Sequence, residues 1–414
     1  MFCCSCGTAV LHEANYCHEC GSSIINQSAE DIENNLPNII EGYFNRGYQY
    51  TPILGLLEKY HGVKIHIRTL KRKLREYGLR RRESNYDEAT VRELITREMQ
   101  DAGKLGGYRY MWHALRLRHH ISVPRRVVAT IMKEIDPEGV RERRARRLTR
   151  RNFISFGPNF TWHIDGYDKL KPYGFPIHGC ICGFSRRIIW LQLVKSNNNP
   201  KVIAQLYLDT VMSLKGCPQI LRSDCGTENV IVAGMQAYFR ATGNDEFSGA
   251  KSHQYGSSPS NQRIEGWWSF FRRSNSGWWI NLFKDMCDSG VLELGNEFQM
   301  HCLWFCYSKL IQDELDKVKD QWNSHYIRRS RHDTVPGVPD ILYYLPEQSG
   351  SLDCLFPVSQ GKIAEVEEQC EQDAINNPYQ EYFEHVLEMQ NLEYPASTDD
   401  AFELFQLFKD LPHN

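Results

Sequence analysis

The octapeptide RSDCGTEN, residues 222–229, follows the apolar residues PQIL and precedes the apolar run VIVAGMQAYF. Asp224 therefore falls where a strand ends and a helix is about to begin. An acidic residue at the carboxyl end of a strand, followed by a turn and a helix, often faces a cleft in α/β proteins. Aspartate also caps turns for local reasons alone. Both interpretations of Asp224 stay open at this point, and the surrounding sequence decides between them.

The sequence from residue 158 onward alternates between strand and helix patterns. We predict three antiparallel strands, a helix, a fourth strand and two further helices, over residues 160–168, 176–185, 186–194, 199–214, 218–224, 229–241 and 260–273. Asp165 then lies inside the first strand, Asp224 closes the fourth, and Glu265 sits on the last helix. This is the order of the ribonuclease H-like fold, in which the first and fourth strands are neighbours. The carboxylates of Asp165 and Asp224 are therefore expected to meet.

Three motifs in this region resemble those of DDE-type integrases and transposases: HIDG at 163–166, RSDCGTEN at 222–229 and NQRIEGWW at 261–268. The similarity is closest to integrase core-domain proteins that are encoded by transposable elements or descended from them. It covers residues 155–330 as an integrase catalytic core, and the upstream helices and the stretch at 322–331 also recur in that family. The resemblance implies an enzyme that hydrolyses a phosphodiester bond and joins DNA strands, with Asp165, Asp224 and Glu265 as catalytic residues.

Metal chemistry gives a reason for three acids. Two Mg²⁺ or Mn²⁺ ions about 3.5–4 Å apart can activate the attacking oxygen and stabilise the leaving oxygen during displacement at phosphorus. Mg²⁺ takes hard oxygen ligands and few protein carboxylates. Asp165 bridging both ions, with Asp224 and Glu265 holding one each, is therefore sufficient. Asp168 and Glu228 are acidic neighbours that the motif positions disfavour, and we do not assign His163 as a ligand.

Other residues around the third motif have two interpretations. Asn261 and Arg263 either orient Glu265 or contact the scissile phosphate, or they are ordinary surface residues of their helix, which we favour. The aromatic residues that follow are expected in the core rather than as a platform for stacking bases. These are Trp267, Trp268, Phe270 and Phe271.

The N-terminus carries two Cys-x2-Cys pairs, Cys3 with Cys6 and Cys17 with Cys20, separated by ten residues. Paired hooks of this spacing place four thiolates at tetrahedral zinc distances. We predict a zinc ribbon over residues 1–26 that binds one Zn²⁺. Cys4 is a spare thiol that could replace Cys3, and the alternative is that all of these cysteines are free.

Residues 36–82 and 86–151 each have the pattern of a helix-turn-helix unit, the second ending in a basic linker. Thr51 is expected to cap one helix, with Pro52 as its first residue, and Ser122 to cap another. The first candidate recognition helix is RTLKRKLREYG at 68–78, with its basic side chains on the solvent side, and two arginines lead the second. The predicted DNA contacts are Arg68, Lys71, Lys73, Arg75, Arg125 and Arg126. The alternative is a pair of solvated basic helices with no nucleic-acid partner.

The chain has 414 residues and a net charge of -2, but its charge is unevenly distributed. Residues 63–151 carry 25 Lys and Arg against 11 acids, whereas 347–414 carry 15 acids against two Lys. The basic stretch is the candidate contact for double-stranded DNA. We expect the remaining C-terminal extension, 331–414, to be acidic and helical or irregular. The run at 141–151 fits either a linker along phosphates or a nuclear-import signal.

Composition also bears on compartment and assembly. No run of eighteen apolar residues and no signal-peptide pattern occurs, so we expect no membrane association. Five of the 14 cysteines lie in the first twenty residues and the others are scattered singly, which favours a reducing compartment. The expectation is a soluble nuclear protein that forms a homo-oligomer on DNA.

The sequence thus predicts a multidomain DNA-binding polynucleotidyl transferase of the integrase/transposase class. Its rival is a domesticated regulatory protein that kept the fold without the reaction. Cys182 favours the rival, because family members commonly have aspartate at that position. A nuclease acting on RNA:DNA hybrids is disfavoured by the paired helix-turn-helix units.

Overall fold

The centre of the computed structural model is a five-stranded mixed sheet with the strand order β3-β2-β1-β5-β6. Pairs β1–β2 and β2–β3 are antiparallel, whereas β1–β5 and β5–β6 are parallel. The strands are β1 (Thr161–Tyr167), β2 (Ile177–Cys182), β3 (Ile188–Leu193), β5 (Ile220–Ser223) and β6 (His253–Tyr255). A second, two-stranded sheet pairs β4 (Gly216–Cys217) with β7 (Phe356–Pro357). The structure describes residues 29–81, 86–100, 106–142, 155–256, 261–329, 335–369 and 378–411.

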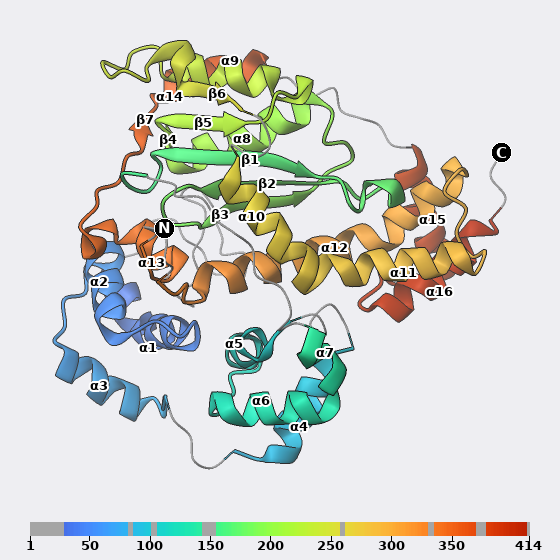
Figure 1. The fold of residues 1–414 in the computed structure, drawn as a ribbon, viewed down its shortest axis with the longest axis horizontal. Coiled ribbons are helices and arrows are strands. Elements are labelled where there is room, and N and C mark those ends of the chain that lie inside the picture. The colour runs from blue at the N-terminus through green and yellow to red at the C-terminus, as the bar shows by residue number, and fades with distance from the viewer. Residues whose placement is uncertain are drawn as a thin grey trace.

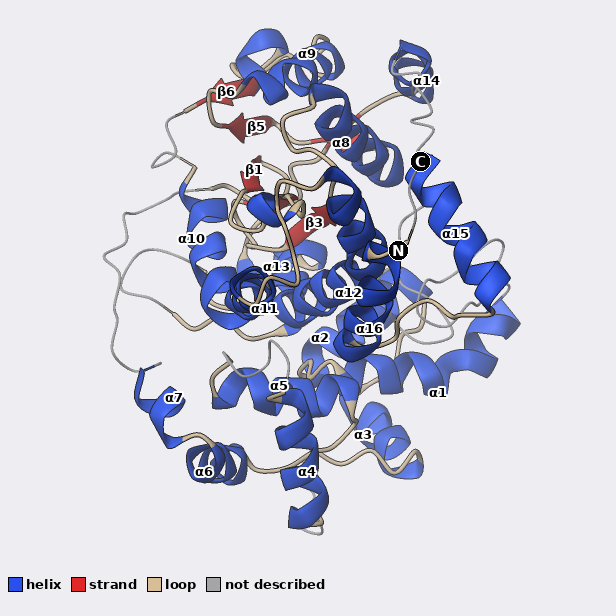
Figure 2. Cartoon of the chain, turned by 90° about the vertical axis from the view of Figure 1, so that its right-hand side faces the viewer, coloured by secondary structure: helices blue, strands red, loops and turns tan. Residues whose placement is uncertain are grey.

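Helices cover both faces of the sheet (Figures 1 and 2). One face packs on α8 (Pro200–Leu214), α9 (Val230–Phe239) and α14 (Gln360–Gln369). In β1, Trp162 and Ile164 join that cluster. Because successive side chains of a strand alternate between faces, His163 and Asp165 point to the opposite face, where α10 lies.

The opposite face packs on a helical layer that includes α10 (Gln262–Phe271). A π-helical segment, Arg272–Ser276, joins α10 to α11 (Gly277–Asp288). The longest helix, α12 (Glu297–Ser324), contacts β3 and carries α15 (Pro378–Gln390) and α16 (Thr398–Lys409). The acidic C-terminal region thus contributes apolar side chains, among them Phe383 and Phe405, to the main core.

The predicted alternation of strands and helices between residues 158 and 273 is confirmed. Each predicted strand and helix of that region is present, and the first and fourth predicted strands, β1 and β5, are neighbours. A central mixed sheet with helices on both faces is compatible with a ribonuclease H-like core. Within the described ranges, every helix is too short or too polar to span a lipid bilayer.

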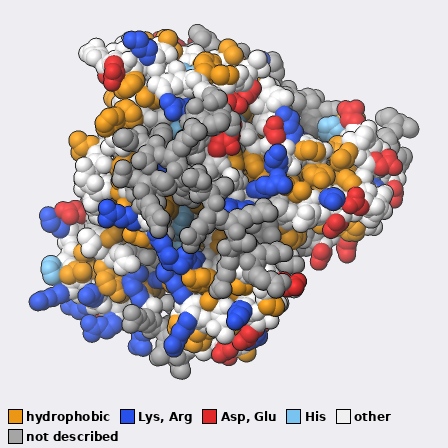
Figure 3. All heavy atoms as spheres, viewed as in Figure 1, with side chains coloured by type: hydrophobic (Ala, Val, Ile, Leu, Met, Phe, Trp, Pro, Cys, Tyr) orange, Lys and Arg blue, Asp and Glu red, His pale blue; other side chains and the backbone are white. Residues whose placement is uncertain are grey.

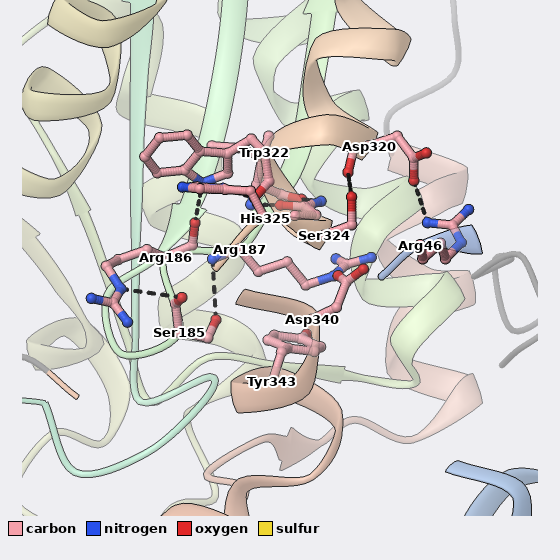
Figure 4. A network of polar contacts seen from close by, with 12 residues as sticks. Arg46, Ser185, Arg186, Arg187, Asp320, Trp322, Ser324, His325, Asp340 and Tyr343 are labelled. Atoms are coloured by element: carbon pink, nitrogen blue, oxygen red, sulfur yellow. Dashed lines mark hydrogen bonds and ion pairs between the residues drawn. The ribbon is translucent and has the colours of Figure 1, made fainter. Parts of the chain in front are cut away.

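The first helical group consists of α1 (Ala29–Asn45), α2 (Tyr50–His61) and α3 (Ile67–Glu76), which share one hydrophobic cluster. Ile341 of α13 (Pro339–Tyr344) and Leu345 belong to the same cluster, so this group packs directly on the C-terminal part of the chain. A polar network reinforces the junction (Figure 4). Its ion pairs are Arg46 with Asp320 and Arg187 with Asp340.

The second helical group consists of α4 (Glu88–Glu98), α5 (Tyr108–Arg118), α6 (Arg125–Ile135) and α7 (Pro137–Glu142). Helices α4 to α6 share a hydrophobic cluster of their own. Polar side chains of α5 attach the second helical group to the core. Arg118 Nη2 donates to Gln321 Oε1 of α12 at 3.2 Å. Asn275 Nδ2 of the π-helical segment donates to the hydroxyl of Tyr110, on α5, at 3.3 Å.

Two predicted helix caps are wrong. Helix α2 begins at Tyr50 with Gln49 as N-cap. Pro52 does not mark the first residue, because proline is tolerated throughout the first helical turn. Thr51 is therefore not a cap. Helix α6 begins at Arg125 with Pro124 as N-cap. The Ser122 hydroxyl donates to the backbone oxygen of Arg81 instead, a distant contact that local sequence could not indicate.

Candidate active site

The pairing of β1 with β5 brings two acidic residues to one edge of the sheet. His163 lies opposite Arg222 in the ladder. Continuing that register by two residues places Asp165 beside Asp224, which directly follows β5. Parallel neighbouring strands end at the same edge, so both half-buried carboxylates face the same region. The expected meeting of the two strands that carry them is confirmed.

Glu265 is the third carboxylate of this region. It lies in the first turn of α10, the helix that contacts β1 and β2. Burial, followed by the charges of Glu265 and Asp224, raises the pKa of Asp165 from 3.8 to about 8. Burial and the two like charges both disfavour the ionised form of Asp165. We refer to Asp165, Asp224 and Glu265 together as the acidic group.

Asn261 attaches the start of α10 to β1. Its side chain is 1 % exposed, its Nδ2 donates to the Ile164 oxygen at 2.8 Å, and its Oδ1 lies 2.7 Å from His163 Nδ1. Since Asn261 Oδ1 can only accept, His163 Nδ1 carries the proton. Burial lowers the pKa of His163 to about 3, which keeps the ring neutral. The preferred prediction that Asn261 is a surface residue is therefore wrong.

Trp268 contacts Asp165 directly. Its indole nitrogen donates to Asp165 Oδ2 at 2.9 Å, and the ring is 5 % exposed. Sequence reasoning placed Trp268 in the core, which is confirmed, but missed its polar contact. The available signal was a glycine inside an apolar strand, which often marks a close approach by another group. That glycine is Gly179, which lies opposite Asp165 in the ladder with β2.

The other acids near the motifs have separate partners. Asp168 is exposed, accepts from Asn197 Nδ2 at 2.5 Å and pairs with Lys171 at 3.6 Å. Glu228 shares a donor with Asp224, because Asn229 Nδ2 lies 3.0 Å from Asp224 Oδ1 and 3.1 Å from Glu228 Oε1. Asn229 therefore fixes the Asp224 carboxylate, a role that sequence reasoning did not assign.

The donor chemistry of this region suits a hard divalent cation. Three carboxylates supply oxygen ligands of the kind that Mg²⁺ prefers. A cation would offset both the burial and the repulsion that raise the pKa of Asp165. In the part of the chain that the structure describes, no three or more His, Cys, Asp or Glu side chains are grouped so that they could hold a metal ion. The three carboxylates are therefore not arranged as a closed metal site.

Cys182 lies away from the carboxylates. It ends β2 opposite Trp162, whereas Asp165 pairs with Gly179 three residues earlier on that strand. Its side chain is buried against Phe184, Leu342 and Tyr343. The thiol therefore fills a small apolar cluster and has no contact with the acidic group.

The predicted DNA-contact residues lie on α3 and at the start of α6. All are exposed except Lys73, which is half-buried with its amine 3.5 Å from the Tyr77 hydroxyl. Leu70 and Leu74 are buried as expected. Lys and Arg side chains gather at the lower left of Figure 3, where α3 lies in Figure 1. The predicted zinc ligands, Cys3, Cys6, Cys17 and Cys20, fall outside the described residues.

Residues 153–343 match the family model of the integrase core domain. No curated protein matches the chain. The matched segment contains the whole five-stranded sheet, all three carboxylates, α10 to α12, and α13 up to Tyr343. It indicates a function of the polynucleotidyl transferase class. Residues 153–343 are therefore similar to the integrase core-domain family and carry an integrase-like core domain.

Proposed function

We propose that this protein is a DNA-binding polynucleotidyl transferase of the integrase/transposase class. The observation that carries the proposal is the register of β1 and β5, which brings Asp165 and Asp224 to one edge of an integrase core sheet, with Glu265 in the first turn of the helix packed on that sheet. In the proposed reaction, water attacks a phosphodiester bond near a DNA end. The liberated 3′-hydroxyl then attacks a phosphodiester of target DNA, which forms a new phosphodiester bond and releases the 3′-hydroxyl of the cut target strand.

In this proposal Asp165, Asp224 and Glu265 hold divalent cations, Mg²⁺ or Mn²⁺. The bound cations would supply activation of the attacking oxygen and stabilisation of the leaving oxygen. The chain itself orients the carboxylates. Asn229 donates to the Asp224 carboxylate, and Asn261 fixes the first turn of α10 against β1. Such preorganisation lowers the cost of reaching the reactive geometry.

The two helical groups are proposed to bind duplex DNA as tandem helix-turn-helix units. Arg68, Lys71 and Arg75 are exposed and spaced along one face of α3, opposite its buried leucines. Arg125 and Arg126 are exposed at the start of α6, where positive charge opposes the helix dipole. Cations at a helix N-terminus suit an anionic partner such as a phosphate backbone, and the Arg125 guanidinium also lies 4.1 Å from the Trp112 ring centroid.

Replacing Arg68, Lys71 and Arg75 together by Ala should weaken duplex binding and flatten its salt dependence. Each neutralised phosphate contributes about 0.9 to the slope of log K against log salt. Fluorescence anisotropy with a labelled duplex, between roughly 50 and 200 mM salt, would measure the slope. A reduction of about 2 to 3 is expected if all three residues contact phosphate.

The matched control removes the same charge elsewhere, from three exposed lysines outside both helical groups. These are Lys251, Lys284 and Lys309. The control should keep the wild-type slope. If both triple variants have the same slope as the wild type, α3 does not contact the DNA backbone.

We also propose that residues 1–26 form a zinc ribbon that assists DNA or partner binding. The basis is the two Cys-x2-Cys hooks, whose thiolates bind Zn²⁺ in closed four-ligand sites. Full-length protein purified without chelator should contain about one zinc per chain by elemental analysis, and Cys17→Ser with Cys20→Ser should remove it. A zinc content unchanged by these substitutions would reject the ribbon.

The proposed activity is tested with a labelled duplex that carries the terminal sequence of the DNA element flanking the gene. Nicking and strand joining that require Mg²⁺ or Mn²⁺ are expected. Binding is measured in parallel in Ca²⁺, and sedimentation of that complex would show the proposed homo-oligomer. Imaging of a tagged chain with and without residues 141–151 would test the proposed nuclear location.

The second candidate function is a domesticated DNA-binding regulator. Cys182 is the observation behind it, since that position commonly holds aspartate in the family that the motifs resemble. Its burial in an apolar cluster, away from the acidic group, weakens this reading. Intact duplex binding without nicking under any divalent cation would favour the regulator over the enzyme.

A further inference from the structure

Trp268 and its neighbours connect three elements at the acidic group. The tryptophan lies three residues after Glu265 and seven after Asn261, so all three side chains share one face of α10. Asn261 bonds the Ile164 oxygen and Trp268 bonds the Asp165 carboxylate. Glu265 is therefore bracketed by two contacts to consecutive residues of β1.

The position of the Trp268 ring depends on a glycine in β2. A Cβ atom on Gly179 would lie 2.9 Å from Trp268 Cη2 and 3.1 Å from Cζ2, closer than side chains tolerate. On another side the ring centroid lies 5.0 Å from that of Tyr167. The indole thus occupies a socket formed by β1 and β2, from which its N–H reaches Asp165.

Trp268 differs from other tryptophans of this protein because its indole N–H donates to a carboxylate. The indoles of Trp112, Trp162, Trp190 and Trp322 donate to backbone oxygens or neutral side chains. The neighbouring Trp267 is also buried, but its N–H has no hydrogen-bond partner among the described residues. Packing in the core therefore does not by itself require Trp268 to bond Asp165.

We propose that Trp268 is a positioning residue for Asp165, holding one carboxylate oxygen through its indole N–H in the socket that Gly179 leaves open. This inference rests on the proposed function, because it assigns Asp165 to cation binding. A neutral donor suits that task. It orients the carboxylate and favours its ionised form without adding a positive charge, which would compete with a bound cation.

Two variants separate the hydrogen bond from the packing. Trp268→Phe keeps an aromatic ring and removes the N–H, whereas Trp267→Phe makes the same change at an indole whose N–H has no partner. Trp268→Phe should raise the Mg²⁺ concentration for half-maximal nicking about threefold to tenfold, the scale of one hydrogen bond to a charged group. Duplex binding in Ca²⁺ should not change. Trp267→Phe should keep the wild-type Mg²⁺ requirement.

A second readout needs no activity. The protein has nine tryptophans, and the indole ¹⁵N–¹H signal of Trp268 is identified by its loss in Trp268→Phe. That signal should move in metal-free Asp165→Asn and on addition of Mg²⁺ to the wild type, while the Trp267 signal should move less. If the wild type never nicks DNA but this signal responds to Asp165→Asn, the proposed function fails and the contact stands. An unresponsive signal, or equal Mg²⁺ requirements in the two variants, would overturn the inference.

Discussion

Asp165→Asn is expected to lower nicking and strand joining by at least about a hundredfold, the scale of losing a major electrostatic contributor, while making the metal-free protein more stable. Both effects have one cause. Asparagine removes the charge proposed to hold cations, and it also removes a carboxylate that the fold accommodates poorly when ionised. Burial, then the charges of Glu265 and Asp224, raises the pKa of Asp165 to about 8.

The pH range of the stability difference follows from that pKa. Below pH 3.8 the carboxyl group is protonated in both the folded and the unfolded chain, so it imposes no cost. Between 3.8 and about 8 the unfolded chain ionises while the folded protein retains the proton. Wild-type stability therefore falls relative to Asp165→Asn by up to about 1.4 kcal/mol per pH unit and then levels off above pH 8.

Thermal unfolding of both proteins in chelator, from pH 5 to 9, measures this difference. The melting temperature of Asp165→Asn should exceed that of the wild type by a margin that widens up to about pH 8. Added Mg²⁺ should raise the wild-type melting temperature more than that of the variant. Asp168→Asn is the matched control, since Asp168 is an exposed acid just beyond the same strand. Equal nicking by wild type and Asp165→Asn would place the chemistry elsewhere.

The order of elements in the core could be predicted because each signal is local. Alternating apolar residues mark β1, and an apolar run followed by a turn marks β5. That these strands are neighbours was predicted from the order of elements in the ribonuclease H-like fold. Their pairing then places Asp165 beside Asp224. The acidic group was accessible to sequence reasoning because two of its members are fixed by strand register.

The contacts that hold the acidic group could not be predicted, because they join residues far apart in the sequence. Asn261 bonds Ile164 across 97 positions, and Trp268 bonds Asp165 across 103. An amide next to a charged residue looks like a surface residue, and adjacent tryptophans look like core. Composition likewise marked the C-terminal region only as acidic, although Phe383 and Phe405 belong to the main core.

The attachment of the first helical group to the core could not be predicted from the sequence either. Asp340 is a central residue of this attachment (Figure 4). Asp340 is 2 % exposed. Its carboxylate accepts from Arg187 Nε at 2.9 Å and from the Tyr48 hydroxyl at 2.9 Å. The guanidinium of Arg187 also lies 5.0 Å from the ring centroid of Tyr343. One carboxylate thus joins the turn between α1 and α2, the start of β3, and α13.

Asp340→Ala should destabilise the protein by about 3–5 kcal/mol, because deleting one member of a buried ion pair leaves the other charge without compensation. Burial raises the pKa of Asp340 although the nearby Arg187 lowers it. Keeping the Asp340 carboxylate ionised therefore costs free energy in the folded protein. Urea unfolding followed by tryptophan fluorescence measures the loss. Asp340→Asn should lose less, since its amide oxygen still accepts one of the two hydrogen bonds.

The matched control is the exposed pair of Lys64 and Glu58, whose side chains are 83 % and 56 % accessible. Lys64→Ala should stay within about 0.5 kcal/mol of the wild type, as exposed ion pairs contribute little. If Asp340→Ala unfolds as the control does, the other contacts of the junction, among them those of Ile341 and Leu345 and the Arg46–Asp320 pair, hold the first helical group in place. A large loss would instead show that the buried ion pair at Asp340 stabilises the junction between the first helical group and the core.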